Sequence, residues 1–526
     1  MKTTASSALA LTVALSLPHA ALAAPQTAGT ELDAIAARPQ FAHALVAAEV
    51  YDLDAKRTLY ARNAGVLMEA ASTTKLLTTG TSLALLGPNF HWTTPVYRTG
   101  PIDSNGVLHG DLVLVASGDP NLSDRIRPDG ALAFENEDHS YDGSYDTRAV
   151  PGDPLAVLRD LAGQVAKAGV KRVDGHVIVD SSLFADAGPE GGTGAVVSPI
   201  VVDDNLVDVT ITPGANVGDP AWMSISPETP YVHFVDDART SAAKSEPTVD
   251  LSADKTNADG SHTVTITGTM PQGRPILYAY RVPTPNLFAQ DAFTVALQGA
   301  GVAVNPPSGA LAFDRNAAAA FYIPANLVAS HVSPPLSEDV YVTLKVSDNL
   351  HAALLPYMWA IYVAHAKTNL LRTGFAQERA LLGGAGLDLR GAAQQDGLGT
   401  SAFFTPRFMV SYLAWAYRQP WFGSFWRALP ILGVDGTLFN IQNQSPAAGK
   451  VHAKTGTWGS QSLLNNNGLY TKGLAGYMTT SHGHHIAFAF YINRMAGKPS
   501  VDTSKDGAHY AGQTLGEMAS DVFEKL

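Results

Sequence analysis

The stretch ASTTKLLTTGTSLALLG, residues 71–87, places hydroxyl residues and a lysine at the start of an apolar run. Its later residues follow an apolar helical pattern, which predicts a helix that opens at Ser72. Ser72 and Lys75 are three positions apart, so on a helix they share one face. A buried lysine is costly unless it is paired or deprotonated. The stretch therefore predicts a serine nucleophile beside a lysine that acts as its base.

The same Ser-x-x-Lys spacing occurs at two other places in the chain, so the spacing alone is weak evidence. These pairs, Ser241–Lys244 and Ser252–Lys255, lie in the polar and acidic segment TSAAKSEPTVDLSADKTNADG, with no apolar helix behind them. We expect them to be solvated loop residues.

Two further motifs follow the Ser72 segment. Ser347-Asp348-Asn349 holds the only Ser-x-Asn spacing in the chain, and Lys454-Thr455-Gly456 is the only Lys-Thr/Ser-Gly sequence. The order Ser-x-x-Lys, Ser-x-Asn, Lys-Thr-Gly is the residue set of active-site serine enzymes that bind penicillin. We expect all three motifs to meet in one catalytic site.

Each motif residue has an expected chemical role. Lys454 provides a second cation that favours a neutral Lys75, which can then deprotonate Ser72. Ser347 relays the proton to the leaving amine, and Asn349 holds Lys75 and the substrate amide in place.

The Lys454-Thr455-Gly456 segment is expected to bind the substrate. A peptide pairs with this strand as an extra strand, and Gly456 has no side chain to obstruct its approach. Lys454 and Thr455 grip a terminal carboxylate. The backbone N–H groups of Ser72 and Thr457 form an oxyanion hole.

Composition and charge narrow the class of protein. The 526 residues are 46% hydrophobic and 16% charged, which is typical of a globular protein of several domains. The net charge of −12 comes without basic blocks and argues against a nucleic-acid partner. The chain has no cysteine, which excludes disulfides, a thiol nucleophile and a lipoprotein anchor. No cofactor and no metal are expected.

The first residues predict export from the cytoplasm. Residues 1–23 combine one positive charge at Lys2, an apolar segment and the small-x-small site Ala21-Leu22-Ala23, which is the pattern of a signal peptide. No later stretch approaches the ~20 apolar residues of a membrane span, so the mature chain is expected to have no transmembrane anchor. The predicted location is the periplasm or the medium.

The pattern along the chain indicates one domain split by an insertion. Residues 24–95 and 330–526 are rich in helical patterns, whereas residues 96–329 carry short alternating runs separated by turns. Residues 121–150 are polar and are expected to form a long exposed loop or small excursion. The histidines of SHGHH (residues 481–485) and the residues Asp203, Asp204 and Asn205 are expected to lie in turns rather than to bind metal.

The chain resembles the class C penicillin-binding proteins of the D-alanyl-D-alanine carboxypeptidase/endopeptidase family. The likeness adds to the three motifs the segments SGDPNL, GHVIVDSSLF, VVDDNLVDVTITPG, RVPTPNLFAQDAFTVALQGAG, LPILGVDGTL and AGKVHAKTGT. It implies an α+β fold, in which a penicillin-binding/β-lactamase-like serine transpeptidase domain (antiparallel sheet with helices) is split by β-rich domains. It also implies DD-peptidase activity on peptidoglycan stem peptides and covalent inhibition by β-lactams.

The chain departs from the family pattern at two places. Relatives usually carry DGSGLSR, whereas this chain reads DGLGTSA (residues 396–402), with Ala402 in place of an arginine implied to hold the stem-peptide diaminoacid. The segment FADAGPEGGTGAVVSP lacks the tryptophan that relatives tend to show. Two alternatives therefore stay open: a related D-amino-acid peptidase, amidase or esterase, and a catalytically silent cell-wall binding protein.

Overall fold

The computed structural model describes residues 24–305, 315–498 and 507–526. The predicted signal peptide, residues 1–23, lies outside the described residues. Within them, no helix is both long and apolar enough to cross a membrane.

An antiparallel sheet joins the two ends of the chain. Its order is β2-β1-β22-β21-β20, so strands from residues 45–62 pair with strands from residues 451–497. The strands are β1 (Leu45–Asp52), β2 (Arg57–Arg62), β20 (Val451–Gln461), β21 (Gly468–Thr479) and β22 (His485–Gly497). This sheet and its helices form an α+β fold, as predicted.

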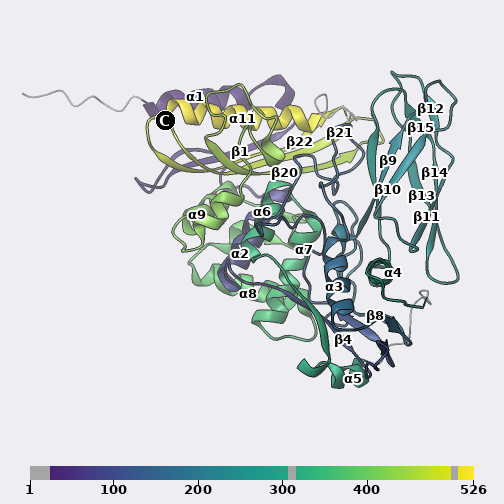
Figure 1. Cartoon of the computed structure of the whole chain (residues 1–526). Coiled ribbons are helices and arrows are strands. Elements are labelled where there is room, and N and C mark those ends of the chain that lie inside the picture. Colours follow the sequence, from purple (N-terminus) through teal and green to yellow (C-terminus); the bar gives the residue numbers. More distant parts are fainter. Residues whose placement is uncertain (1–23, 306–314, 499–506) are drawn as a thin grey trace, which may run out of the picture.

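The central strand β22 is buried on both faces because its two sets of alternate residues pack against different helices. Phe488, Phe490 and Ile492 pack in one apolar core with α1 (Ala24–Ala36) and α11 (Gly507–Lys525). The residues between them, Ala487, Ala489 and Tyr491, belong to the core of the helical body on the opposite face. Figure 1 shows α1 and α11 above the sheet and the helical body below it.

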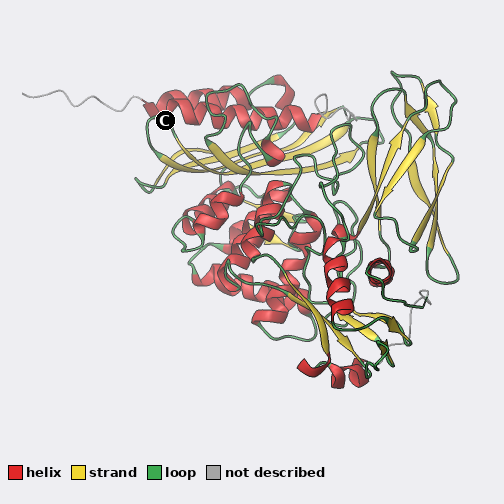
Figure 2. Ribbon diagram, viewed as in Figure 1, coloured by secondary structure: helices red, strands yellow, loops and turns green. Residues whose placement is uncertain are grey.

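The helical body carries most of the chain between the insertion and the last strands (Figure 2). Its helices are α2 (Lys75–Leu85), α6 (Leu336–Lys345), α7 (Asn349–Met358), α8 (Leu370–Gly384), α9 (Pro406–Ala416) and α10 (Phe422–Ala428). A small sheet of β3 (Met68–Glu69), β18 (Ala392–Gln394) and β19 (Ala402–Phe404) borders it.

The middle of the chain forms a β-rich region with a hydrophobic core of its own (Figure 1). One sheet has the order β17-β4-β6-β8 and carries α3 (Ala156–Lys167) and α4 (Pro285–Gly299) nearby. Its strands are β4 (Thr93–Arg98), β6 (Leu112–Val115), β8 (Val177–Asp180) and β17 (Leu327–Val332), with β5 (Val107–Leu108), β7 (Arg172–Val173) and α5 (Arg315–Ala318) as smaller elements.

The remaining strands of this region form small sheets. They are β9 (Leu206–Thr212), β10 (Trp222–Ser226) and β16 (Ile276–Arg281), then β11 (Val232–Asp236), β13 (Asp250–Thr256) and β14 (His262–Thr267), and finally β12 (Arg239–Ser241) with β15 (Thr269–Pro271). The predicted insertion boundaries, after residue 95 and before residue 330, fall inside β4 and β17, which pair with each other. The division into domains stays a prediction.

Residues 121–150 form a loop without a named helix or strand, as expected, but much of this loop is buried rather than exposed. Asn121, Arg125, Asp138 and His139 are each 1% exposed. The segment has the polar composition of a surface loop, yet these charged side chains are buried. They pair with one another and with Asp204, and the ion pairs compensate for the loss of water in the interior.

Candidate active site

The turn that carries Ser72 precedes the helix rather than opening it. Residues Ala71–Thr74 form a 3-10 turn, and α2 begins at Lys75, three residues after the predicted start. Ala71 has a positive φ of 45°, so the chain bends sharply just before Ser72. The bend brings the Ala71 carbonyl against Gly399, where a Cβ would lie 2.0 Å from that oxygen. Ser72 borders an open cleft.

Lys75 is completely buried and meets the two predicted serine motifs. Its Nζ lies 2.8 Å from Ser72 Oγ, 2.6 Å from Asn349 Oδ1 and 3.4 Å from Ser347 Oγ. Burial lowers the pKa of Lys75 to about 8, although the carboxylates of Asp348, Glu190 and Asp396 oppose the shift. A substantial fraction of the amine is therefore neutral near physiological pH and can accept a proton.

The connection between α6 and α7 directs Ser347 and Asn349 at Lys75. Ser347 has a left-handed φ of 68°, and Asp348 caps α7 by accepting a hydrogen bond of 2.9 Å from the His351 N–H. This tight turn places residues 347 and 349 on the cleft side of the helix start.

The loop of residues 396–402 contacts Lys75. The sequence showed this loop only as a departure from the family pattern. The Asp396 carboxylate accepts hydrogen bonds from several N–H groups of its own loop, which fixes the Leu398 carbonyl 3.4 Å from Lys75 Nζ. Ala402 is fully buried in β19, and its carbonyl accepts a 2.9 Å hydrogen bond from Ala70 N.

The edge strand β20 runs along the Ser72 turn. Lys454 is fully buried, and its Nζ donates to the Thr455 carbonyl at 2.9 Å. Burial lowers the pKa of Lys454 well below its ordinary value, and the charges of Lys75 and Lys472 lower it further. Thr455 and Thr457 border the cleft.

The expected reason for Gly456 needs correction. A Cβ at this position would lie 2.5 Å from the Ala70 carbonyl oxygen, so the missing side chain lets β20 pack on the Ser72 turn. The cleft is bordered by Thr455 and Thr457 on either side of it, and Lys454 lies behind the cleft wall. Lys454 is not among the residues that border the cleft, and its expected grip on a terminal carboxylate stays a prediction.

The cleft has a volume of about 550 Å³ and includes residues that no motif indicated. Lys472 of β21 borders it and donates to Thr457 Oγ1 at 2.6 Å. Asn136, Glu137 and Tyr141 reach it from the segment that was expected to be an exposed loop. Only the folded chain brings these residues to the site, because no spacing or local pattern connects them with the three motifs.

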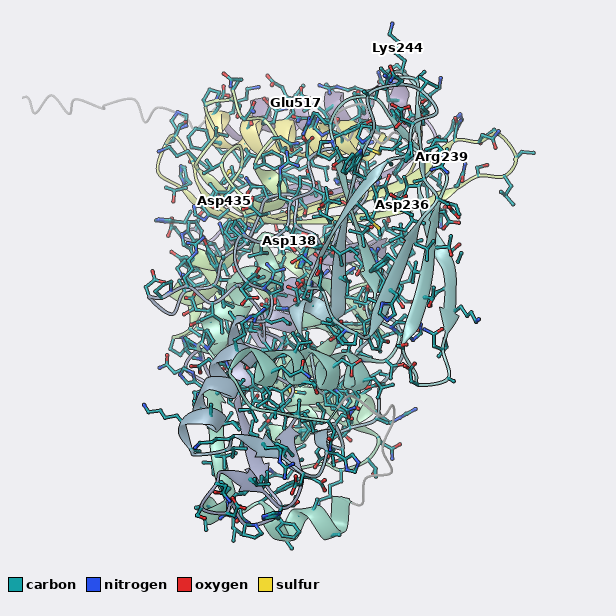
Figure 3. All side chains as sticks on the ribbon, turned by 45° about the vertical axis from the view of Figure 1, so that its right-hand side comes forward. Asp138, Asp236, Arg239, Lys244, Asp435 and Glu517 are labelled. Carbon is teal, nitrogen blue, oxygen red and sulfur yellow. The ribbon has the colours of Figure 1, made fainter. Side chains whose placement is uncertain are left out.

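The two other Ser-x-x-Lys pairs lie far from this cleft. Lys244, Ser252 and Lys255 are exposed, and Figure 3 shows Lys244 pointing outward from the β-rich insertion while Asp138 lies in the interior. Ser252 and Lys255 belong to strand β13 rather than to the loop expected for them.

A serine and a buried lysine lie beside the edge strand of an antiparallel sheet, with the Ser-x-Asn motif opposite. This arrangement defines the class of penicillin-binding serine hydrolases. A model of the D-Ala-D-Ala carboxypeptidase 3 (S13) family matches residues 28–513. The chain belongs to this family of serine hydrolases, as the resemblance implied.

Named relatives agree with the family. The chain is 28% identical over 517 residues to a D-alanyl-D-alanine carboxypeptidase of Actinomadura sp. (strain R39), a match that covers 93% of this chain and 86% of the relative. It is 22% identical over 446 residues to the D-alanyl-D-alanine carboxypeptidase DacB of Haemophilus influenzae, covering 82% and 81% of the two chains.

The fold is shared with a solved structure. The crystal structure of penicillin binding protein 4 (dacB) from Haemophilus influenzae superimposes with a TM-score of 0.68 at 19% identity and covers 94% of this chain and 99% of that chain. A second structure of that protein, complexed with a β-lactam, gives a TM-score of 0.67. The predicted penicillin-binding/β-lactamase-like fold is confirmed.

Proposed function

We propose that the protein is an exported serine D-Ala-D-Ala carboxypeptidase and DD-endopeptidase that acts on peptidoglycan stem peptides and is acylated by β-lactams. The observation that carries the proposal is the position of one buried amine, Lys75 Nζ, within 3.4 Å of Ser72 Oγ, Ser347 Oγ and Asn349 Oδ1. These groups stand beside β20, the edge strand of the main sheet, whose first residues bond to residues 430–432.

The proposed reaction begins at Ser72. Neutral Lys75 takes the hydroxyl proton while Ser72 Oγ attacks the carbonyl carbon between the two D-alanines. The carbon–nitrogen bond breaks, an ester forms on Ser72, and the departing D-alanine amine receives the proton through Ser347. Water then attacks the ester, giving up a proton to the same base, and releases the shortened peptide. In DD-endopeptidase action, the leaving amine belongs to a cross-linked peptide.

The substrate is proposed to lie along β20. An extended peptide adds to the edge strand through main-chain hydrogen bonds. Thr455 and Thr457 border the cleft, and Lys472, bonded to Thr457, places a positive charge beside them for a terminal carboxylate. In the structure the Thr455 hydroxyl donates to Thr437 Oγ1 at 2.8 Å, and we expect it to turn to the carboxylate when substrate binds. The N–H groups of Ser72 and Thr457 are the proposed oxyanion donors.

Digestion of defined muropeptides tests this function. We expect wild-type protein to release D-alanine from a pentapeptide ending in D-Ala-D-Ala and to split a D-alanyl cross-link, with both products identified by mass. Ser72→Ala should give neither product. Release of D-alanine by Ser72→Ala would overturn the assignment of the nucleophile.

The second candidate function is hydrolysis of other D-amino-acid amides or esters. It is motivated by Ala402, whose small side chain is fully buried and presents no charge to a substrate diaminoacid. Comparison of kcat/KM for a D-Ala-D-Ala peptide and for D-alanine amide and ester separates the two. A preference for the amide or ester would favour this second candidate.

The proposed location is the periplasm or the medium, after removal of residues 1–23. The support is the signal-peptide pattern of the sequence. Cell fractionation together with the intact mass of the purified mature chain tests it. A full-length mass from the cytoplasmic fraction would contradict it.

A further inference from the structure

The polar segment of residues 121–150 reaches from the insertion to the catalytic turn. The Tyr141 hydroxyl lies 2.8 Å from the Ser347 carbonyl oxygen and 3.1 Å from Asn349 Oδ1, and it donates toward both. Asn349 Oδ1 also accepts from Lys75 Nζ at 2.6 Å. One amide oxygen therefore connects the tyrosine to the amine that activates Ser72.

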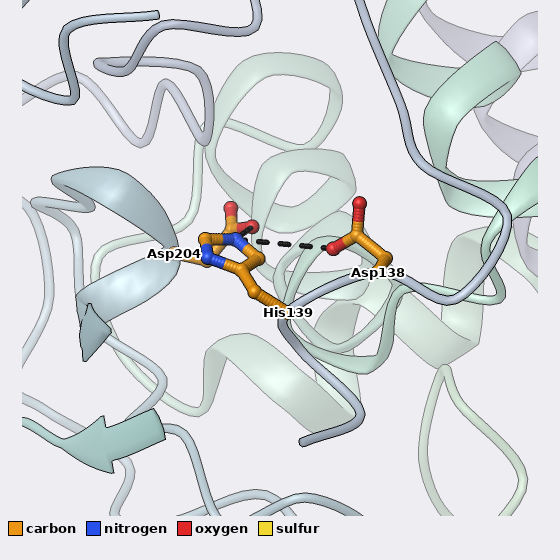
Figure 4. Close-up of side chains that lie close together, drawn as sticks. All are labelled: Asp138, His139 and Asp204. Carbon is orange, nitrogen blue, oxygen red and sulfur yellow. Dashed lines mark hydrogen bonds and ion pairs between the residues drawn. The ribbon is translucent and has the colours of Figure 1, made fainter. Parts of the chain in front are cut away.

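The residues just before Tyr141 are anchored by a buried ion network (Figure 4). Arg125 donates to both carboxylate oxygens of Asp138, at 2.8 and 3.0 Å, and to Asp204 Oδ2 at 2.6 Å. His139 Nε2 lies 3.0 Å from the same Asp204 oxygen, and its Nδ1 lies 3.0 Å from Asp208 Oδ1. Because every one of these side chains is at most 9% exposed, the network fixes the backbone that carries Tyr141.

The same Asp204 carboxylate holds the helix that starts at Asn349. Its second oxygen lies 3.0 Å from His351 Nε2, and His351 Nδ1 lies 2.8 Å from Asp339 Oδ1. Asp204 thus bridges the segment that carries Tyr141 and the helix that carries Asn349. The two groups around Asp204 are compact enough to hold a metal ion, but the Asp204 carboxylate already pairs with Arg125, His139 and His351.

Burial and the carboxylates act against each other on the two histidines. Burial lowers the pKa of each imidazole, but the carboxylates of Asp208 and Asp204 around His139, and of Asp348, Asp339 and Asp204 around His351, outweigh it. The pKa of both residues is raised well above the ordinary value. Both therefore stay cationic, and the network holds its form through the neutral pH range.

Given the proposed function, on which this depends, we propose that Tyr141 is a positioning residue for acylation. Its hydroxyl holds the Ser347 carbonyl and the Asn349 amide, which keeps both side chains directed at Lys75. The left-handed φ of Ser347 is a strained conformation for a residue with a side chain. A hydrogen bond to its carbonyl offsets part of that strain.

The test measures acylation by a chromogenic cephalosporin in wild type and in Tyr141→Phe, with the first-order constant k2 separated from the dissociation constant K. Removing one hydrogen bond is expected to lower k2 by about five- to tenfold. K should be unchanged, because the ring remains, and the melting temperature should fall by only a few degrees, because one hydrogen bond is lost. Tyr145→Phe removes a phenol hydroxyl from the same segment without touching the motifs and should acylate as wild type does.

A second variant separates the hydroxyl from ring packing. Tyr141→Met also lacks the hydroxyl but fills the space differently, so it should lose k2 to the same extent as Tyr141→Phe. A wild-type k2 in Tyr141→Phe, a weaker K with unchanged k2, or a loss in the methionine variant alone would overturn the proposal. Wild-type protein that forms no adduct at all would instead contradict the proposed function.

Discussion

Lys75 is the residue on which the chemistry depends. Its amine is removed from water and surrounded by neutral acceptors, two serine hydroxyls, one amide oxygen and one carbonyl. Among the described residues, none of the hydrogen-bond partners of the amine is a carboxylate. The site therefore destabilises the ammonium form, which is the condition for a lysine to serve as a base.

We expect the rate of acylation to follow the neutral fraction of Lys75. Because burial lowers the pKa of Lys75 to about 8, the rate should rise with pH and level off above that value. One pH unit below the midpoint, about a tenth of the amine is neutral, so the rate should be about a tenth of its plateau. Stopped-flow acylation between about pH 6 and pH 9.5 measures this. A pH-independent rate would contradict a lysine base.

Lys75→Met should slow acylation greatly without destabilising the protein. A buried ammonium with a lowered pKa costs folding free energy, so an apolar replacement should leave the free energy of unfolding unchanged or raise it by about 1–3 kcal/mol. Urea unfolding and the penicillin adduct mass measure the two effects. The matched control is Lys345→Met, which leaves the partner carboxylate of Asp435 unpaired and should lower stability by about 1–3 kcal/mol. Lower stability in Lys75→Met would contradict the account.

At the scale of single residues, the motifs predict much of the site but not all of it. Ser72, Lys75, Ser347 and Asn349 carry recognisable spacings, and the structure brings them together. Tyr141 and Lys472 could not be predicted, because a tyrosine in a polar segment and a lysine in a strand have no local signature of a cleft. Their place depends on long-range packing.

At the scale of elements, the Ser72 turn and strand β20 act as one unit. Gly456 allows the strand to approach the turn, and Ala70 connects the turn to β19 on the other side. The turn that carries Ser72 is thus held between two strands, while Lys75 at the start of α2 bonds to the Ser72 hydroxyl. The cleft keeps its shape only if β20 stays close.

Gly456→Ala should impair acylation strongly. The added Cβ would lie 2.5 Å from the Ala70 carbonyl, and both groups are backbone or fixed to it, so β20 must move away. We expect acylation to fall by at least about tenfold and stability by about 1–3 kcal/mol. Gly383→Ala in α8 is the control, because nothing lies within 4 Å of its added Cβ. Wild-type acylation by Gly456→Ala would show that the close approach has no catalytic role.

Prediction of elements succeeds where periodicity is strong and fails where pairing is long-range. The apolar run after residue 75 is helical as expected, but the helix begins three residues late because the Ser72 turn is tighter than an α-helix. Residues 121–150 have the composition of a solvated loop, and only the folded partners Asp204 and Asp208 explain their burial.

In the whole molecule, buried ion pairs connect the insertion to the catalytic body. His351 of α7 and His139 of the insertion share the Asp204 carboxylate. The patterns along the chain predict an insertion, and the middle of the chain forms a core of its own. The division into domains stays a prediction. The insertion also contributes residues to the cleft. This contribution could not be predicted, because it depends on which loop of the insertion faces α7.

The ion network should make stability depend on pH. His351 keeps its proton in the folded state, whereas in the unfolded chain histidine releases it at about pH 6.5. The folded state therefore binds more protons above that value, and the melting temperature should fall between about pH 6.5 and pH 8. His351→Gln should fall less steeply, while the exposed His233→Gln should follow wild type. Equal slopes in all three proteins would contradict a cationic His351.

The location of the penicillin adduct shows whether Ser72 is the nucleophile and Lys75 its base. Purified protein is incubated with a penicillin, digested with trypsin and analysed by mass spectrometry. We predict one adduct per chain, on the peptide of residues 63–75 and assigned to Ser72 by fragmentation. It should be absent from Ser72→Ala and formed at a greatly reduced rate by Lys75→Met. An adduct on another peptide, or one formed by Ser72→Ala, would contradict the account.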